Sequence, residues 1–137
     1  MIYLATPYSH PDAAVRKQRF ELACRVAGEM MSAGEYVYSP IAHSHSISEM
    51  CDLPTSWDYW RGFDELMIRN CSLVMVVKAE GWQESEGIAA EMIIAAELGK
   101  PIGFIEMVEV GKWLEVTQTS RMLTGMNIQS THERKPS

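Results

Sequence analysis

Two acidic residues in the sequence occupy positions where acid–base or nucleophilic chemistry is possible. Glu91 lies almost two turns inside a predicted helix that Ser85 would cap, and its neighbours on both sides are alanine, methionine and isoleucine. Such apolar surroundings favour a partly desolvated carboxyl group. Asp64 lies inside the preceding predicted helix, just upstream of an apolar strand. For both residues the alternative is a solvated position on the outer face of a helix, which is the commoner place for an acidic side chain.

The start of the Glu91 helix, residues 85–87, is a further candidate site. Backbone N–H groups and a serine hydroxyl at such a position can bind an anion. The simpler interpretation is an ordinary helix N-cap. Glu84 and Glu86 beside it suit the helix dipole but would repel a phosphate.

His43 and His45 form a His-x-His pair, with Cys51 and Asp52 nearby. Such a pair can bind zinc when further ligands converge on it. No second cluster of ligand residues follows downstream. We therefore expect no metal, and His43 is interpreted as either a substrate-contacting or a structural histidine.

Aromatic residues supply another kind of candidate. Tyr3 lies on the first predicted strand, where its hydroxyl could point into a crevice or its ring could fill the core. Four further aromatic residues could stack on a nucleobase, although packing is their default role: Trp57, Tyr59, Trp60 and Trp82. The chain has no Walker-type loop and no G-x-G-x-x-G motif, so no dinucleotide or triphosphate cofactor is expected.

Hydrophobic periodicity predicts the elements that must position these side chains. Strands are expected over residues 1–5, 36–39, 73–77 and 101–105. Helices are expected over residues 12–33, 56–70, 85–98 and 110–123. Residues 40–55 are rich in serine and histidine, and we expect a loop there with one helical turn at most.

The alternation of strands and helices predicts an α/β fold. We expect a single Rossmann-like doubly wound domain with a mainly parallel sheet of four to five strands. The apolar run at 73–77 suits a strand that is buried on both faces, as in a parallel sheet. The domain is expected to span residues 1–125, followed by a polar, frayed tail over 126–137.

Ligands of doubly wound folds bind at the carboxyl ends of the strands. This rule places residues 6–10, 40–45 and 78–87 around one crevice. Thr6 and Tyr8, which directly follow the first strand, are therefore candidate substrate-binding residues.

Composition excludes several classes of protein. The chain has 137 residues, of which 47% are hydrophobic and 22% charged, with a formal net charge of -6. These values are typical of a globular protein rather than a disordered or fibrous one. The acidic charge argues against a nucleic-acid polymer as partner, and no apolar run approaches the roughly 20 residues of a membrane helix. With three cysteines, an odd number, and no apparent signal peptide, we expect a cytoplasmic protein with reduced thiols.

Several segments occur in the order found in one known family. They are IYLATPY at 2–8, SPIAHS at 39–44, CSLVMVV at 71–77 with Asp64 ahead of it, and SEGIAAE at 85–91 followed by GKPI at 99–102. Over roughly residues 1–105 the sequence resembles the nucleoside 2-deoxyribosyltransferase superfamily, which includes the 2'-deoxynucleoside 5'-phosphate N-hydrolases. It looks closest to a small, mostly bacterial and phage branch known as a domain of unknown function.

The resemblance implies a role for several candidates. Glu91 matches the family nucleophile, Asp64 the carboxylate that assists the leaving base, and Tyr3 a tyrosine that hydrogen-bonds the nucleophile. His43 matches a pocket histidine. The resemblance also implies a homodimer or higher homo-oligomer with active sites near the subunit interfaces, and a reaction that needs neither a metal nor an organic cofactor.

The resemblance bears on phosphate binding as well. Ser85 and Gly87 match the phosphate-contacting helix start of the hydrolases. Some of these hydrolases carry an arginine near the position of Tyr8, which is absent here. Arg16 or Arg19 could replace it if the first helix points its start at the crevice.

The expected function is cleavage, or transfer, at the N-glycosidic bond of a nucleoside or nucleoside 5'-monophosphate. Breaking that bond builds positive charge on the anomeric carbon, which a carboxylate such as Glu91 can stabilise or trap. Two alternatives stay open. One is a non-catalytic module of the same fold that binds nucleosides or nucleotides, and the other is a metal-dependent hydrolase that uses His43, His45 and Asp52.

Overall fold

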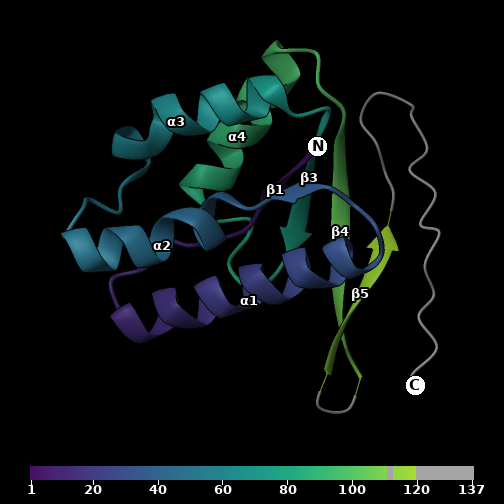
Figure 1. The fold of residues 1–137 in the computed structure, drawn as a ribbon, viewed down its shortest axis with the longest axis horizontal. Coiled ribbons are helices and arrows are strands. Elements are labelled where there is room, and N and C mark those ends of the chain that lie inside the picture. Colours follow the sequence, from purple (N-terminus) through teal and green to yellow (C-terminus); the bar gives the residue numbers. More distant parts are fainter. Residues whose placement is uncertain (111–112, 120–137) are drawn as a thin grey trace.

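A five-stranded sheet with the order β2-β1-β3-β4-β5 forms the centre of the described part of the protein (Figure 1). The computed structural model describes residues 1–110 and 113–119. The strands are β1 (Ile2–Ala5), β2 (Val37–Tyr38), β3 (Leu73–Lys78), β4 (Ile102–Val110) and β5 (Trp113–Thr119). The first four pair in parallel, and β5 pairs antiparallel with β4. The expected α/β fold with a mainly parallel sheet is confirmed.

Helices cover both faces of this sheet. They are α1 (Ala13–Ser32), α2 (Pro40–Cys51), α3 (Trp57–Asn70) and α4 (Glu86–Glu97). The core residues of α1 pack on one face and those of α3 and α4 on the other, while α2 packs against α1 (Figure 1). Because both faces are covered, β3 can be apolar on both sides, as the sequence predicted. None of the helices in the described ranges is long and apolar enough to cross a membrane.

Successive side chains of β1 point to opposite faces of the sheet. Ile2 and Leu4 belong to the core cluster that includes α1, whereas Tyr3 and Ala5 belong to the cluster that includes α3 and α4. Full burial of one aliphatic side chain of this size stabilises a fold by about 1.5–3 kcal/mol, so this alternation firmly sets which side of β1 faces which helices. Tyr3 is consequently held on the same side of the sheet as the two helices that carry the acidic candidates.

Residues 40–51 form a helix, so the expectation of a loop over 40–55 is wrong. Ser39 caps α2, with its Oγ accepting the Ala42 N–H at 3.1 Å, and Pro40 takes a first-turn position where its missing N–H costs nothing. Hydrophobic periodicity did not reveal this helix, because its buried side is partly polar and includes His45 and Ser48.

Residues 113–119 form strand β5, so the helix expected over 110–123 is wrong where the structure describes it. β4 continues to Val110, and the pairing runs from Val110 opposite Trp113 to Phe104 opposite Thr119. The sequence of β5, WLEVTQT, is rich in aromatic and β-branched residues, which favour a strand. The end of the domain expected at residue 125 and the tail expected over 126–137 lie outside the described residues.

Candidate active site

A pocket lies beside β1 and β3, the two neighbouring strands from which the chain continues in opposite directions across the sheet. From β1 the chain passes through α1 to β2 on one side, and from β3 it passes through α4 to β4 on the other. Doubly wound folds bind ligands at this kind of switch point. The pocket is partly open to solvent, and a cleft at this position of an α/β sheet is a common place for a small ligand. Its lining includes residues from each of the three segments, 6–10, 40–45 and 78–87, that were expected around one crevice at the carboxyl ends of the strands.

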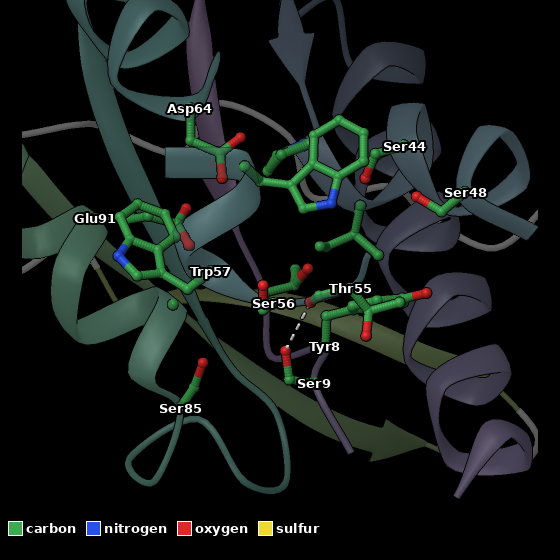
Figure 2. Close-up of a pocket in the computed structure, with 15 residues that line it drawn as sticks. Tyr8, Ser9, Ser44, Ser48, Thr55, Ser56, Trp57, Asp64, Ser85 and Glu91 are labelled. Atoms are coloured by element: carbon green, nitrogen blue, oxygen red, sulfur yellow. Dashed lines mark hydrogen bonds between the residues drawn. The ribbon is translucent and has the colours of Figure 1, made fainter. Parts of the chain in front are cut away.

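Acidic and hydroxyl side chains face each other across this pocket. Figure 2 shows Asp64 and Glu91 on one side and Ser44 and Ser48 of α2 on the other. Eight lining residues carry a hydroxyl group: Thr6, Tyr8, Ser9, Ser44, Ser48, Thr55, Ser56 and Ser85. The indoles of Trp57 and Trp60 complete the apolar part of the wall.

Glu91 lies on the buried side of α4. Helical spacing puts it in line with Ile88 and Ala95, which belong to the core. The residue is 5% exposed, and its Oε2 has no hydrogen-bond partner within the described residues. Burial, and then the nearby charge of Asp64, raise the pKa of the Glu91 carboxyl well above its usual range. Of the two positions considered for Glu91, the structure has the desolvated one.

The start of α4 lies beside the Glu91 carboxyl. Ser85 is the N-cap, and its Oγ accepts the Ile88 N–H at 3.2 Å. A Cβ atom on Gly87 would lie 3.5 Å from Glu91 Oε1 and 3.7 Å from Ser85 Oγ. The glycine therefore leaves space next to the carboxyl, and the capping interpretation of Ser85 is confirmed.

Asp64 and Tyr3 reach the same place from α3 and β1. Asp64 is 7% exposed and lies one turn before the buried Ile68. Burial raises the pKa of its carboxyl to about 7, against a smaller opposing effect of the Tyr3 hydroxyl. Tyr3 is fully buried. Burial, followed by the charges of Glu91 and Asp64, raises the pKa of its phenol well above the usual value.

These three groups influence one another but are incompletely hydrogen-bonded. Tyr3 Oη and Glu91 Oε2 each lack a partner of regular hydrogen-bond geometry among the residues described. Tyr3 nevertheless lies near enough to both carboxyls to oppose the rise in their pKa. Two buried carboxyls that interact do not readily ionise together. Near neutral pH we therefore expect the pair to share about one proton, which makes one group an acid and the other a base.

Tyr8 and His45 form a second polar pair at the pocket. Tyr8 lines the pocket, and its Oη lies 2.6 Å from Nδ1 of His45. His45 is 9% exposed, and its ring stacks on Phe20 with the centroids 4.3 Å apart. Sequence reasoning grouped His45 with possible metal ligands because, without α2, nothing indicated that it faced the core.

His43 lies outside the lining of this pocket. Its ring stacks on Phe63 with the centroids 5.6 Å apart and is tilted against Tyr38. Asp52 ends α2 in the left-handed conformation. In the part of the chain that the structure describes, no group of three or more His, Cys, Asp or Glu side chains is placed to hold a metal ion. The set of His43, His45 and Asp52 is thus not brought together as metal ligands.

Thr6 directly follows β1 and lines the pocket. It is 4% exposed, and its Oγ1 has no hydrogen-bond partner in the described residues. Thr6 therefore lies where a ligand in the pocket could meet its hydroxyl group. Sequence reasoning missed Ser44 and Ser48, whose signal was the Ser39-Pro40 pair that begins α2.

The sequence matches a known family over almost all of the described part of the chain. A comparison with curated proteins finds no match. The family match covers residues 1–107, which include every strand and helix from β1 to α4 and all the candidate residues named above. The chain belongs to the family described as a domain of unknown function, DUF1937.

Proposed function

We propose that this protein cleaves the N-glycosidic bond of a nucleoside or nucleoside 5'-monophosphate, with Glu91 as the nucleophile. The observation that carries the proposal is the buried pair of carboxyls, Asp64 and Glu91, at one wall of a small-molecule pocket. Their approach from two helices and the nearby Tyr3 hydroxyl give one acid, one base and an orienting group. The resemblance to the nucleoside 2-deoxyribosyltransferase superfamily supports the same assignment.

The chemistry needs these groups for a physical reason. When the bond between C1' and the base nitrogen breaks, its electron pair stays on the base, and the sugar acquires oxocarbenium-like positive charge. A carboxylate that has little water around it stabilises that charge strongly. In the substrate-free pocket, burial favours the neutral form of Glu91. We expect the developing positive charge on the sugar to favour its ionised form, so that the shared proton is then held by Asp64.

The reaction proceeds in two balanced steps. First, the Glu91 carboxylate bonds to C1' as the base departs, and Asp64 gives its proton to the base. Second, water attacks C1' while Asp64 takes back a proton, which releases the sugar and restores Glu91. If a second base takes the place of water, the same steps transfer the sugar. Tyr3 can donate its phenolic proton to either carboxylate and so keep its orientation.

A homo-oligomer is part of this proposal. Tyr59, Phe63 and Leu66 are 50%, 40% and 55% exposed and follow helical spacing along α3, and Ile93 on the neighbouring α4 is 59% exposed. Exposed apolar side chains gathered in this way favour contact with another protein surface. A cytoplasmic location is also proposed, because free Cys24, Cys51 and Cys71 suit a reducing compartment.

The test is a screen of nucleosides and their 5'-monophosphates for release of free base, with and without an acceptor base. Glu91→Gln should lower turnover by at least about 10³-fold while ligand binding is kept. Glu97→Gln, an exposed glutamate of the same helix, is the matched control and should keep full turnover. If ligand binds but no substrate is ever cleaved, the protein is a binding module of this fold and the proposal is wrong.

A further inference from the structure

The pocket is lined by hydroxyl groups, indoles and carboxyls, and by no basic side chain among the described residues. Its charged lining residues are Asp64 and Glu91, and both are acidic. Burial, and then the charge of Glu49, raise the pKa of the Tyr8 phenol, while the charge of Arg16 and a contact of its side chain with the Tyr8 hydroxyl oppose this rise. The lining thus offers many neutral hydrogen-bonding groups and an excess of negative charge.

Arg16 and Arg19 of α1 both donate hydrogen bonds to backbone carbonyl oxygens. Arg16 donates from Nη1 to the carbonyl oxygens of His10 and Pro11, at 2.6 and 3.1 Å. Neither Arg16 nor Arg19 lines the pocket. Arg16 nevertheless contacts the hydroxyl of the lining residue Tyr8, so one cation lies beside the pocket wall, where protein oxygens already engage it.

Arg19 belongs to a different cavity. It donates from Nη1 to the Ser9 carbonyl oxygen at 2.8 Å, and its Nη2 lies 2.6 Å from the place that a Cβ on Gly81 would occupy. Together with His10 and Glu80 it lines a separate hollow of about 350 Å³. Its side chain therefore lines that hollow and not the pocket of the carboxyl pair.

Helix N-termini also supply positive potential at the pocket. α3 and α4 begin at its wall, and each helix start carries about half a positive charge. The first turns already contain Asp58 and Glu86, which offset this potential. The buried carboxyls of Asp64 and Glu91 lie deeper in the same helices. The N-termini are thus compensated by the protein's own carboxylates.

We infer that the pocket binds an uncharged nucleoside and discriminates against its 5'-monophosphate. A phosphate group carries about -1.5 to -2 charges at neutral pH, and here it would approach the carboxyl pair while Arg16, beside the wall, is engaged by the carbonyl oxygens of His10 and Pro11. Sugar hydroxyls, by contrast, both donate and accept, which matches the hydroxyl-rich wall and the buried Thr6 Oγ1 that has no partner in the described chain. The inference rests on the proposed function only in taking the ligand to be a nucleoside.

The experiment measures binding and turnover separately. The four common 2'-deoxynucleosides and their 5'-monophosphates are titrated calorimetrically into the full-length protein at low salt, where a phosphate contact would be strongest. Release of free base is followed in parallel. We expect the best nucleoside to bind at least about tenfold more tightly than its own monophosphate. Equal or tighter binding of the monophosphate would overturn the inference.

A designed cation tests whether missing positive charge is the cause. Ser9 is an exposed residue at the edge of the pocket, and its Oγ makes only a long contact, 3.4 Å, with the Thr55 carbonyl oxygen. Ser9→Arg should raise the ratio of monophosphate to nucleoside affinity about tenfold, and Ser9→Gln should leave this ratio unchanged. An unchanged ratio in Ser9→Arg, with a thermal unfolding midpoint like that of the wild type, would count against the inference.

The binding titration and the base-release measurement together separate failure of the inference from failure of the proposed function. Preferential nucleoside binding without base release supports the inference and removes the proposed reaction. Base release with a preference for the monophosphate leaves the reaction standing and overturns the inference. Absence of binding to every compound in the panel overturns both.

Discussion

The hydroxyl of Tyr8 lies 2.6 Å from Nδ1 of His45, and so connects the wall of the pocket to the buried side of α2. His45 is itself held by its stacking on Phe20. A tyrosine hydroxyl that contacts both His45 and Arg16 is held in one orientation at the pocket wall. The pair therefore orients a group that can meet a ligand, although it makes no contact with the carboxyl pair in the described structure.

Tyr8→Phe and His45→Gln should each weaken nucleoside binding about fivefold, which corresponds to the loss of one ordinary hydrogen bond. Because both changes break the same contact, the double variant should bind no more weakly than the worse single variant. Calorimetric titration of the wild type, the two single variants and the double variant measures this double-mutant cycle. Additive losses would mean that the two side chains act independently and that the pair has no orienting role.

Protein stability should fall as pH rises from about 4 to 7. The pKa of Asp64 is raised to about 7 in the folded protein, and that of Glu91 is also raised, whereas unfolded carboxyls titrate near pH 4. The folded state therefore holds protons that the unfolded state has released, and the stability that these groups contribute is fully present below pH 4 and lost towards pH 7. Asp64→Asn should flatten this dependence and raise the unfolding midpoint at pH 7. Urea unfolding from pH 5 to 8 measures it, with Asp58→Asn on the same helix as the control.

Gly87→Ala should fold normally but bind and react poorly. The new methyl group would lie at ordinary contact distances from Glu91 Oε1 and Ser85 Oγ, so no clash arises. Inside a helix, alanine is favoured over glycine by up to about 1 kcal/mol, so the unfolding midpoint should stay the same or rise. The methyl group would nevertheless occupy space beside the reacting carboxyl, and we expect kcat/KM to fall about tenfold or more.

Gly62→Ala provides the matched control for that variant. Gly62 lies within α3, and a Cβ there would meet nothing within 4 Å. The helix propensity gain should be similar, and kcat/KM should not change. Equal effects of both substitutions on kcat/KM would show that the space beside Glu91 is unimportant.

Leu66→Glu should shift the protein towards a smaller assembly. Leu66 is 55% exposed and belongs to the apolar row on α3, so a charge there would be costly in a buried contact between copies. Met50→Glu on α2, at 87% exposure, is a control away from this row. Light scattering after gel filtration reports the mass of each variant. A wild-type protein that is monomeric at micromolar concentration would contradict the proposed oligomer.

Local patterns in the sequence were sufficient for the main elements. The apolar run 73–77 became the central strand β3, and Ser85 became the N-cap of α4. Both follow from short-range physics, namely burial on two faces and an N-terminal hydrogen bond. Sequence reasoning was wrong where tertiary packing, rather than the local sequence pattern, determines the secondary structure. It missed α2, whose buried side is partly polar, and it assigned a helix to β5, a strand that forms by pairing with β4.

By itself, the sequence determined the α/β class, the edge of the sheet where a pocket forms, and the candidate residues Tyr3, Asp64 and Glu91. Only the tertiary structure decided whether each of these side chains would be buried or exposed to solvent. Parallel strand pairing brings β1 beside β3, and α3 and α4 then pack over the same face, so two carboxyls 27 positions apart become buried neighbours. It also separated His43 from His45, since residues two positions apart in a helix do not share a face. Burial and proximity arise from packing between elements distant in sequence, and no local pattern contains them.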